Sequence, residues 1–350
     1  MKRQDPERAD LCDRAASMLR NGGIVAFPTE TVYGLGAVVF DEKAVARVFE
    51  VKQRPRFDPL IVHVSGPEQL PLLVDTIPAI AQRLIAHFWP GPLTLVLPKT
   101  QAVPDLVTAG LGTVAVRMPR HPLALDLIER TGKPIAAPSA NPFGYVSPTM
   151  AEHVRRHLGD RIDMVLDGGP CTVGLESTVL SLTGPRPAIL RAGGVTREAI
   201  EQVIGSTIET GAASGRVTAP GQTPSHYAPR TPVVMATEGY AIPAGARAGR
   251  LRFGRQGTTV GFDAMEELSP AGDVREAAIG LFAALHRLDA LGLDIIVADP
   301  VPESGLGVAV MDRLRRAAAK STPACAVNLC EYIRMNGRNN YASLIHSQSS

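Results

Sequence analysis

Short apolar runs alternate with amphipathic helical stretches through the first 205 residues, and this alternation constrains the fold more than any other feature. Apolar runs bounded by Gly or Pro predict buried strands, and apolar residues spaced three or four apart predict helices. Because such elements pack as layers when short connections join them, the pattern predicts one α/β domain. We expect strands at 24–27, 60–64, 93–97, 113–118, 135–137, 164–166, 178–182 and 188–190. We expect helices at 7–20, 42–51 (with Asp41 as N-cap), 77–88, 121–131, 149–158 and 196–204.

A change of composition separates a second unit from the first. Residues 206–232 are rich in Gly, Ser, Thr, Ala and Pro without a sustained apolar period, which is typical of a linker. Beyond it we expect strands at 232–235, 250–253, 258–261 and 294–298, and helices at 271–291 and 305–320. The sequence therefore predicts a first domain at 7–205, a linker or lid at 206–232, a C-terminal α/β domain at 233–323 and a disordered tail at 324–350.

Charge and cysteine content exclude several classes of protein. The 36 Lys and Arg nearly balance the 34 Asp and Glu, in both halves of the chain, so an anion site must be a local cluster. The four cysteines contain no CxxC pair, which disfavours a disulfide framework or a zinc site and favours a reducing compartment. The charged N-terminus lacks the apolar region of a signal peptide, and no stretch approaches the ~20 apolar residues of a membrane helix. We predict a cytoplasmic protein without membrane contact.

Nucleotide-binding motifs of the common kinds are incomplete. Three GxG triplets occur, but none extends to GxGxxG, and no P-loop is present. Residues 27–36, FPTETVYGLG, instead follow a predicted strand with hydroxyls, a carboxylate and glycines, which suit small-molecule recognition. A turn in which Thr and Glu only cap backbone groups is an equally good interpretation.

Two further segments carry polar side chains next to predicted strands. Lys52, Arg54 and Arg56 form a proline-stiffened cationic loop that could clamp a triphosphate, although a solvated charged turn is the commoner outcome. Residues 136–142, AAPSANP, offer neutral hydrogen bonds from Ser139 and Asn141, or a simple turn between prolines.

Taken together, these segments and their order resemble the YrdC-like family of threonylcarbamoyladenylate synthases. The resemblance covers about residues 10–205 and rests on GGIVAFPTETVYGLGA, KQRP, PLIVHV, WPGPLTLVL, VAVRMP, APSAN, LESTVLSL and ILRAGG. The linker motif APGQTPSHYAPRTPV and the unit after it resemble the longer, two-domain branch. The resemblance implies an open, twisted, mixed α/β sheet with a second, smaller Rossmann-like α/β domain.

Site residues follow from the resemblance, position by position. It implies that ATP is bound by Lys52, Arg54, Asp58, Thr113, Ser139, Asn141, Ser147, Arg191 and Tyr227. It implies that threonine is bound by Thr31, His63, Arg117, Ala137 and Ser177. Lys52 and Arg54 are the expected catalytic residues, and Tyr227 would make the linker a lid over the nucleotide. Asp58 stands where the family usually has Asn, and a carboxylate there would repel a triphosphate unless it meets magnesium or an arginine.

The implied activity is that of a nucleotidyltransferase in tRNA modification. L-Threonine, bicarbonate and ATP, with Mg²⁺, would give threonylcarbamoyladenylate and diphosphate, for the tRNA adenosine next to the anticodon. The expected partners are the tRNA threonylcarbamoyl transferase machinery, in transient contact, and weakly bound RNA; no metal ligand from the protein is expected. One alternative is the YrdC-like module of the hydrogenase-maturation carbamoyl transferases, whose CxxC zinc motifs are absent here. An RNA-binding module is the other, against which the balanced charge argues.

Overall fold

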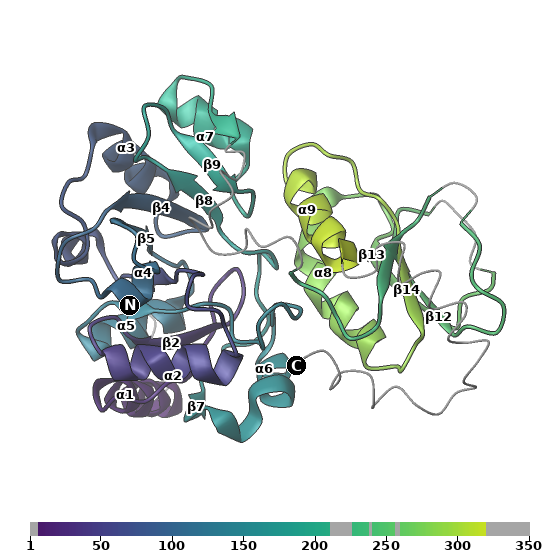
Figure 1. Ribbon diagram of the computed structural model, residues 1–350, viewed down its shortest axis with the longest axis horizontal. Helices are drawn as coiled ribbons and strands as arrows, with labels where there is room; N and C mark the ends of the chain where they lie inside the picture. The colour runs from purple at the N-terminus through teal and green to yellow at the C-terminus, as the bar shows by residue number, and fades with distance from the viewer. Residues whose placement is uncertain (1–5, 211–225, 238–239, 256–259, 320–350) are drawn as a thin grey trace, which may run out of the picture.

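The computed structural model describes residues 6–210, 226–237, 240–255 and 260–319, which form two α/β domains (Figure 1). Among these residues, the first domain holds a ten-stranded mixed sheet and the second a four-stranded parallel sheet. The expected fold class, a mixed sheet with a smaller second α/β domain, is confirmed. No helix in the described ranges is long and apolar enough to cross a membrane.

The first sheet has the strand order β10-β9-β8-β4-β5-β3-β6-β2-β1-β7. Its strands are β1 (Val25–Phe27), β2 (Gly34–Val38), β3 (Ile61–His63), β4 (Leu93–Pro98), β5 (Thr113–Arg117), β6 (Ile135–Ala136), β7 (Met164–Val165), β8 (Thr178–Ser181), β9 (Ala188–Arg191) and β10 (Glu209–Thr210). Its helices are α1 (Pro6–Arg20), α2 (Glu42–Lys52), α3 (Ala79–Phe88), α4 (Asp105–Thr108), α5 (Pro122–Thr131), α6 (Ala151–Leu158) and α7 (Arg197–Ile204). Two 3₁₀ turns, η1 (Pro67–Leu72) and η2 (Gly159–Arg161), complete the first domain.

Local signals place the helices where the sequence predicts them. The Asp41 carboxylate accepts a hydrogen bond from the Ala44 backbone N–H at 3.0 Å and thereby caps α2. Thr196 caps α7 in the same way, through the backbone N–H of Ala199. The expected helices of the first domain are therefore confirmed, with ends shifted by one or two residues.

Strand β2 is the main element that the sequence analysis misses. From the sequence, residues 27–36 are either a segment for small-molecule recognition or a simple turn, whereas Gly34–Val38 pairs antiparallel with both β1 and β6. A Cβ atom on Gly36 would lie 2.7 Å from Cγ2 of Ile135 and 2.8 Å from Cε1 of Phe27. The lack of a side chain at Gly36 is thus needed for close packing inside a sheet. In the sequence, such a glycine looks the same as a glycine in a loop.

The second domain has the strand order β11-β14-β12-β13, and every pair is parallel. Its two helices lie on the side of the sheet that faces the first domain (Figure 1). The elements are β11 (Val233–Met235), β12 (Ala248–Phe253), β13 (Ala264–Ser269), α8 (Val274–Asp289), β14 (Ile295–Ala298) and α9 (Gly307–Ala318).

One predicted strand of the second domain is wrong. Val260 and Gly261 form a turn, residues 258–259 lie outside the described ranges, and the strand is Ala264–Ser269 instead. Two consecutive glutamates conceal this strand in the sequence: Glu266 pairs with Arg287 of α8, and Glu267 pairs with Arg252 of the neighbouring strand β12. The predicted disordered tail and residues 211–225 of the predicted linker lie outside the described residues.

Four clusters of buried apolar side chains among the described residues form the cores of the two domains. Three belong to the first domain: one packs α1 and α5 against the sheet, a larger one includes side chains of α2, α3 and α7, and a small one lies on β3, β4, β5 and β8. The fourth is the core of the second domain, but it also contains four side chains from outside residues 233–319: Val32, Val146, Leu175 and Tyr227. The core of the second domain therefore extends into loops of the first.

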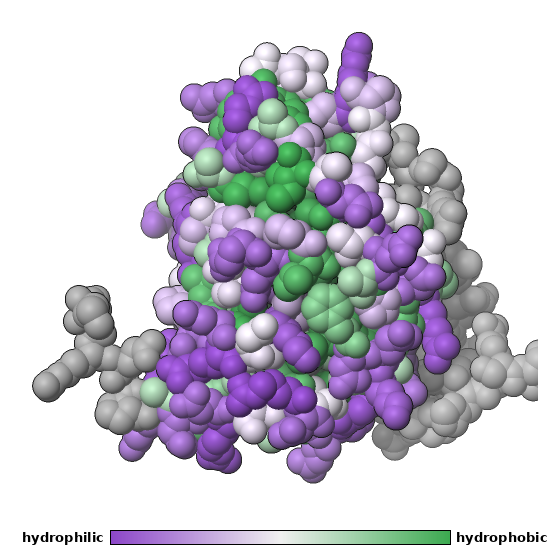
Figure 2. All heavy atoms as spheres, turned by 90° about the vertical axis from the view of Figure 1, so that its left-hand side faces the viewer, coloured by the Kyte–Doolittle hydropathy of each residue, from purple (hydrophilic) through white to green (hydrophobic). Residues whose placement is uncertain are grey.

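The face of the first domain that points away from the second carries a mixed surface (Figure 2). Hydrophilic residues cover most of its lower part, and apolar residues appear between them higher up. The pocket lined by buried polar side chains does not lie on this face but near the second domain.

Candidate active site

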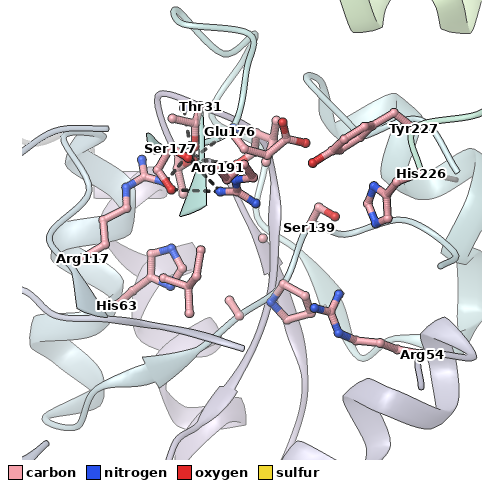
Figure 3. Close-up of a pocket in the computed structure, with 16 residues that line it drawn as sticks. Thr31, Arg54, His63, Arg117, Ser139, Glu176, Ser177, Arg191, His226 and Tyr227 are labelled. Carbon is pink, nitrogen blue, oxygen red and sulfur yellow. Dashed lines mark hydrogen bonds between the residues drawn. The ribbon is translucent and has the colours of Figure 1, made fainter. Parts of the chain in front are cut away.

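A pocket opens between the ends of the first domain's strands and the segment that leads into the second domain (Figure 3). Its walls come from segments up to 198 positions apart in the sequence, which is possible because the strands end at one edge of the sheet. It is lined by Thr29, Thr31, Val32, Gly34, Arg54, Ile61, His63, Arg117, Ala137, Pro138, Ser139, Glu176, Ser177, Arg191, His226 and Tyr227.

Arg117 and His63 occupy one side of the pocket because their strands run in parallel. The register of β3 and β5 places the two residues opposite each other at the carboxyl ends of the strands. The Arg117 guanidinium donates to Thr31 Oγ1 at 2.9 Å and to the Gly91 carbonyl at 3.2 Å. It also lies 2.6 Å from Oε1 of Glu30, so its orientation is fixed and its charge is partly balanced.

His63 is neutral at physiological pH. Burial, and secondarily the nearby Arg117, lower the pKa of its imidazole to about 3. Its Nδ1 atom is buried without a hydrogen-bond partner among the described residues. The ring therefore offers the pocket a hydrogen-bonding group and an apolar surface, but no charge.

Arg191 lies between the two sides of the pocket (Figure 3). It ends β9 and donates to the Ser177 carbonyl at 2.8 Å and to Ser177 Oγ at 3.2 Å. Ser177 Oγ in turn lies 2.7 Å from Oγ1 of Thr94, which fixes the hydroxyl. A second buried cation is thus held in a defined position.

Arg54 supplies positive charge on the opposite side, and Asp58 is its partner. Nη2 of Arg54 lies 3.0 Å from Oδ1 of Asp58 and donates to the Pro59 carbonyl at 2.9 Å. Burial raises the pKa of Asp58, while Arg54 and Lys52 act in the opposite direction. Asp58 therefore forms an ion pair with an arginine, and this pairing reduces the repulsion that its carboxylate would exert on a triphosphate.

Lys52 lies behind the pocket and does not line it. Its Nζ donates to the Ser139 carbonyl at 2.5 Å and also to the Asn141 carbonyl. The Asn141 amide donates to the Tyr145 carbonyl at 2.8 Å. Burial, and then the charge of Arg54, lower the pKa of Lys52 well below its usual range. Lys52 and Asn141 thus hold the loop that carries Ser139.

Tyr227 and His226 form the wall nearest to the second domain. Tyr227 is fully buried, and its hydroxyl, without a hydrogen-bond partner among the described residues, points into the pocket (Figure 3). Its ring stacks on Phe282 of α8 with the centroids 5.6 Å apart. Its φ of 63° lies in the left-handed region, which is costly for a residue with a Cβ atom.

The structure brings most of the predicted site residues together. Those that line the pocket are Thr31, Arg54, His63, Arg117, Ala137, Ser139, Ser177, Arg191 and Tyr227. Lys52, Asp58, Asn141 and Ser147 are buried but do not line the pocket. Thr113 begins β5, about 13 Å along the strand from Arg117 at its other end. Seven lining residues were not among those predicted from the sequence: Thr29, Val32, Gly34, Ile61, Pro138, Glu176 and His226. Glu176 and His226 adjoin the predicted residues Ser177 and Tyr227.

Fold and pocket together define a class of protein. A mixed α/β sheet presents three buried arginines, Arg54, Arg117 and Arg191, to one pocket, and a second small parallel domain closes one wall. Such a site suits an enzyme that holds anionic small molecules.

Known proteins identify the family. A family model described as "Telomere recombination" (Sua5, YciO, YrdC) matches residues 17–193. A second, described as "Threonylcarbamoyl-AMP synthase, C-terminal domain", matches residues 195–319. The threonylcarbamoyl-AMP synthase of Pyrococcus abyssi is 48% identical over 87% of this chain and 93% of its own. That of Bacillus subtilis is 44% identical over 90% and 93%.

A solved structure agrees with the sequence relatives. The crystal structure of P. abyssi Sua5 complexed with L-threonine superposes with a TM-score of 0.82 at 44% identity, covering 89% of this chain and 94% of that one. The chain belongs to the Sua5/YrdC family, in its two-domain Sua5 type. It is accordingly an ATP-using threonylcarbamoyl-AMP synthase that serves threonylcarbamoyl modification of tRNA.

Proposed function

We propose that the pocket binds L-threonine and ATP side by side and joins them, with bicarbonate, into threonylcarbamoyl-AMP and diphosphate. The observation that carries this proposal is the convergence of Arg54, Arg117 and Arg191 on one buried pocket. Two anions, a carbamate and a triphosphate, must approach each other in this reaction. Fixed positive groups in a site with little water reduce that repulsion.

Threonine is assigned to the side of Arg117. The residues that we assign to it are Thr31, His63, Arg117, Ala137 and Ser177. In Figure 3 the labelled members of this set lie together, away from Arg54 and Tyr227. The P. abyssi relative was solved in complex with L-threonine, which supports a threonine site in this chain. Arg117 would pair with the substrate carboxylate, and neutral His63 would accept or donate a hydrogen bond.

ATP is assigned to the opposite side. Arg54, Ser139, Arg191 and Tyr227 would contact the nucleotide directly, because they line the pocket. Lys52, Asn141 and Ser147 would act from behind the pocket wall, and Asp58 through its ion pair with Arg54. Arg54 remains our candidate for a catalytic residue, whereas Lys52, expected from the resemblance to be catalytic, would position the loop that carries Ser139. Thr113 stays a prediction from the resemblance.

The chemistry needs orientation and charge more than a dedicated nucleophile in the protein. The threonine amine attacks bicarbonate and yields a carbamate with loss of water. A carbamate oxygen then attacks the α-phosphorus of ATP, the bond to the β-phosphate oxygen breaks, and diphosphate leaves with the electron pair. The product is a mixed anhydride that water hydrolyses readily, so a buried pocket with Tyr227 as its outer wall protects it.

Magnesium would enter with ATP. The described residues contain no group of three or more His, Cys, Asp or Glu that could hold a metal ion. Among the described residues, the one carboxylate that lines the pocket is Glu176, and it is already hydrogen-bonded to Ser147 and Arg313. Phosphate oxygens and water suit Mg²⁺ as ligands, and the bound ion lowers the charge of the triphosphate.

The product is then consumed by a transferase. We expect transient contact with the tRNA threonylcarbamoyl transferase machinery in the cytoplasm, and weak RNA binding at most, because the chain is nearly neutral. RNA binding that depends strongly on salt, in a protein that does not consume ATP, would instead favour an RNA-binding module.

Diphosphate release tests the proposal. We expect release only when ATP, Mg²⁺, bicarbonate and L-threonine are all present. Arg54→Met should reduce kcat/KM by about a hundredfold, since a buried charge would be lost from the pocket. Arg56→Met is the matched control, because Arg56 belongs to the same loop but is exposed. Diphosphate release that does not require threonine would contradict the assignment of the substrate.

A further inference from the structure

A buried arginine of the second domain reaches the wall of the pocket. Arg313 lies on α9 and is completely shielded from solvent. Its Nε donates to Oε2 of Glu176 at 3.0 Å, and its Nη1 donates to the Ala192 carbonyl at 2.7 Å. Its guanidinium also lies 5.1 Å from the ring centroid of Tyr227. Arg313 thus contacts two residues that line the pocket, although it does not line it itself.

Glu176 needs a partner because of where it lies. It is the one carboxylate among the described residues that line the pocket, and it is nearly buried. Its other oxygen, Oε1, accepts a hydrogen bond from Ser147 at 2.6 Å. Without a cation beside it, this carboxylate would repel a triphosphate and would compete with it for the positive charge of Arg191.

Tyr227 is held from two sides by the second domain. Phe282 of α8 stacks on its ring, and Arg313 of α9 lies over the ring as a cation. The left-handed backbone at Tyr227 is unfavourable in isolation, so side-chain contacts must stabilise it. The apolar cluster of the second domain includes Tyr227 as well as Val32, Val146 and Leu175 from loops of the first domain.

We propose that Arg313 is a positioning residue for the synthase reaction: it neutralises Glu176 and holds Tyr227 in place, so that the second domain completes the nucleotide site. This inference rests on the proposed function, because it takes the pocket to be the site of ATP. It gives the second domain an indirect part in substrate binding, through one guanidinium that contacts two residues of the pocket wall.

Removal of the charge alone tests this role. Arg313→Met keeps much of the side-chain volume, and we expect the Kd for ATP by calorimetry and the KM for ATP to rise about tenfold or more. The kcat at saturating ATP should change less than the KM. Arg313→Lys keeps a positive charge and should fall between the wild type and Arg313→Met. This second variant keeps the test open if the first does not fold.

Rescue distinguishes positioning from simple stability. In Arg313→Met/Glu176→Gln no carboxylate is left without a partner, because Asp312, the other acidic partner of Arg313, keeps its ion pair with Arg316. The KM should therefore return to within about threefold of the wild-type value. Arg250→Met is the matched control: Arg250 is also buried in the second domain and lies 2.9 Å from Asp299, away from the pocket. It should lower the thermal midpoint and leave the KM for ATP unchanged.

These outcomes distinguish a failure of the role proposed for Arg313 from a failure of the function proposed for the pocket. ATP binding by Arg313→Met that equals wild type, or a double variant whose defects simply add, overturns the role of Arg313. A wild-type protein that binds ATP but releases no diphosphate contradicts the proposed function and leaves the binding test of Arg313 intact. Equal KM effects in Arg313→Met and Arg250→Met would show general destabilisation and would also overturn the inference.

Discussion

At the scale of single residues, the ion pair of Arg54 and Asp58 determines how much positive charge the loop after α2 offers to a ligand. The carboxylate lies 3.0 Å from the guanidinium, and its second oxygen, Oδ2, is buried without a hydrogen-bond partner among the described residues. Two backbone carbonyls, of Asp58 and Pro59, also hold the arginine. The position of Arg54 therefore does not depend on the carboxylate alone.

Asp58→Asn should strengthen ATP binding. The amide keeps the size of the side chain and the backbone contacts of Arg54, while it removes the negative charge, so we expect the KM for ATP to fall by about three- to tenfold. Steady-state kinetics at varied ATP measures this. Asp299→Asn, at a buried ion pair of the second domain, is the control and should leave the KM unchanged. A rise in KM for Asp58→Asn would mean that the carboxylate itself positions Arg54.

Lys52→Met should affect stability as well as activity. The methionine leaves the carbonyls of Ser139 and Asn141 without their donor, which should lower the free energy of unfolding by about 3 kcal/mol. Urea unfolding measures this change. Lys43→Met, on the exposed face of the same helix, should lower it by less than about 0.5 kcal/mol. Equal stability of the two variants would place Lys52 in solvent.

The candidate site was predictable where the resemblance assigned a motif, and not beyond it. His63, Arg117 and Arg191 each end an apolar strand, so their meeting at one edge of the sheet agrees with the pattern, whereas Arg54 comes from the loop after α2. Glu176 gave no signal, because its importance depends on Arg313, which lies 137 positions away in another domain. Contacts of that kind depend on how the domains pack, which local patterns in the sequence do not contain.

At the scale of elements, strand β2 shows how packing determines the meaning of a glycine. Its two glycines adjoin the Phe27 ring, and Gly36 also adjoins Ile135, so a side chain would collide with the sheet's neighbours. From the sequence, the same residues are predicted to form a loop, because glycine in a short run is typical of both a loop and a closely packed strand. The alternation of apolar runs and amphipathic stretches predicted the other long elements, since burial fixes their period. Strand β13 was not predicted because Glu266 and Glu267 lie in its middle and interrupt the apolar run.

Gly36→Val should destabilise the first domain. The new Cβ atom would lie 2.7 Å from Cγ2 of Ile135 in a closely packed layer, so we expect a loss of about 2–3 kcal/mol in the free energy of unfolding. Guanidinium unfolding monitored by circular dichroism measures it. Gly112→Ala comes from another GxG triplet and has open space around it, so it should be nearly neutral. A neutral Gly36→Val would contradict the assigned packing of β2.

At the scale of the whole molecule, histidines join the two domains. His153 of α6 stacks on His286 of α8 with the centroids 3.9 Å apart, and His286 Nε2 lies 3.2 Å from the Ser147 carbonyl. Burial, and then the charge of Arg156, lower the pKa of His153 to about 4. Burial, and then His153, lower the pKa of His286 to about 2. The interface therefore requires uncharged rings.

Acid should weaken the protein before its carboxylates titrate. A histidine in the unfolded chain has a pKa of about 6.5. Below that pH the unfolded chain therefore binds protons that His153 and His286 do not bind in the folded protein. The stabilisation is complete above pH 6.5 and is lost as the pH falls toward 4, by on the order of 3 kcal/mol for His153. Thermal unfolding from pH 8 to 4.5 measures it. His153→Asn should flatten this dependence, whereas His87→Asn, at an exposed ring, should not.

The apolar cluster of the second domain also contains side chains from the first domain and the linker, and this affects how the protein responds to heating. Tyr227, Val32 and Leu175 lose their packing partners when α8 and α9 melt, even if the larger sheet stays intact. Unfolding of the smaller of the two folded parts would then be enough to stop this enzyme from working. Stabilising mutations placed in the four-stranded sheet, far from any substrate, would raise the temperature at which this happens.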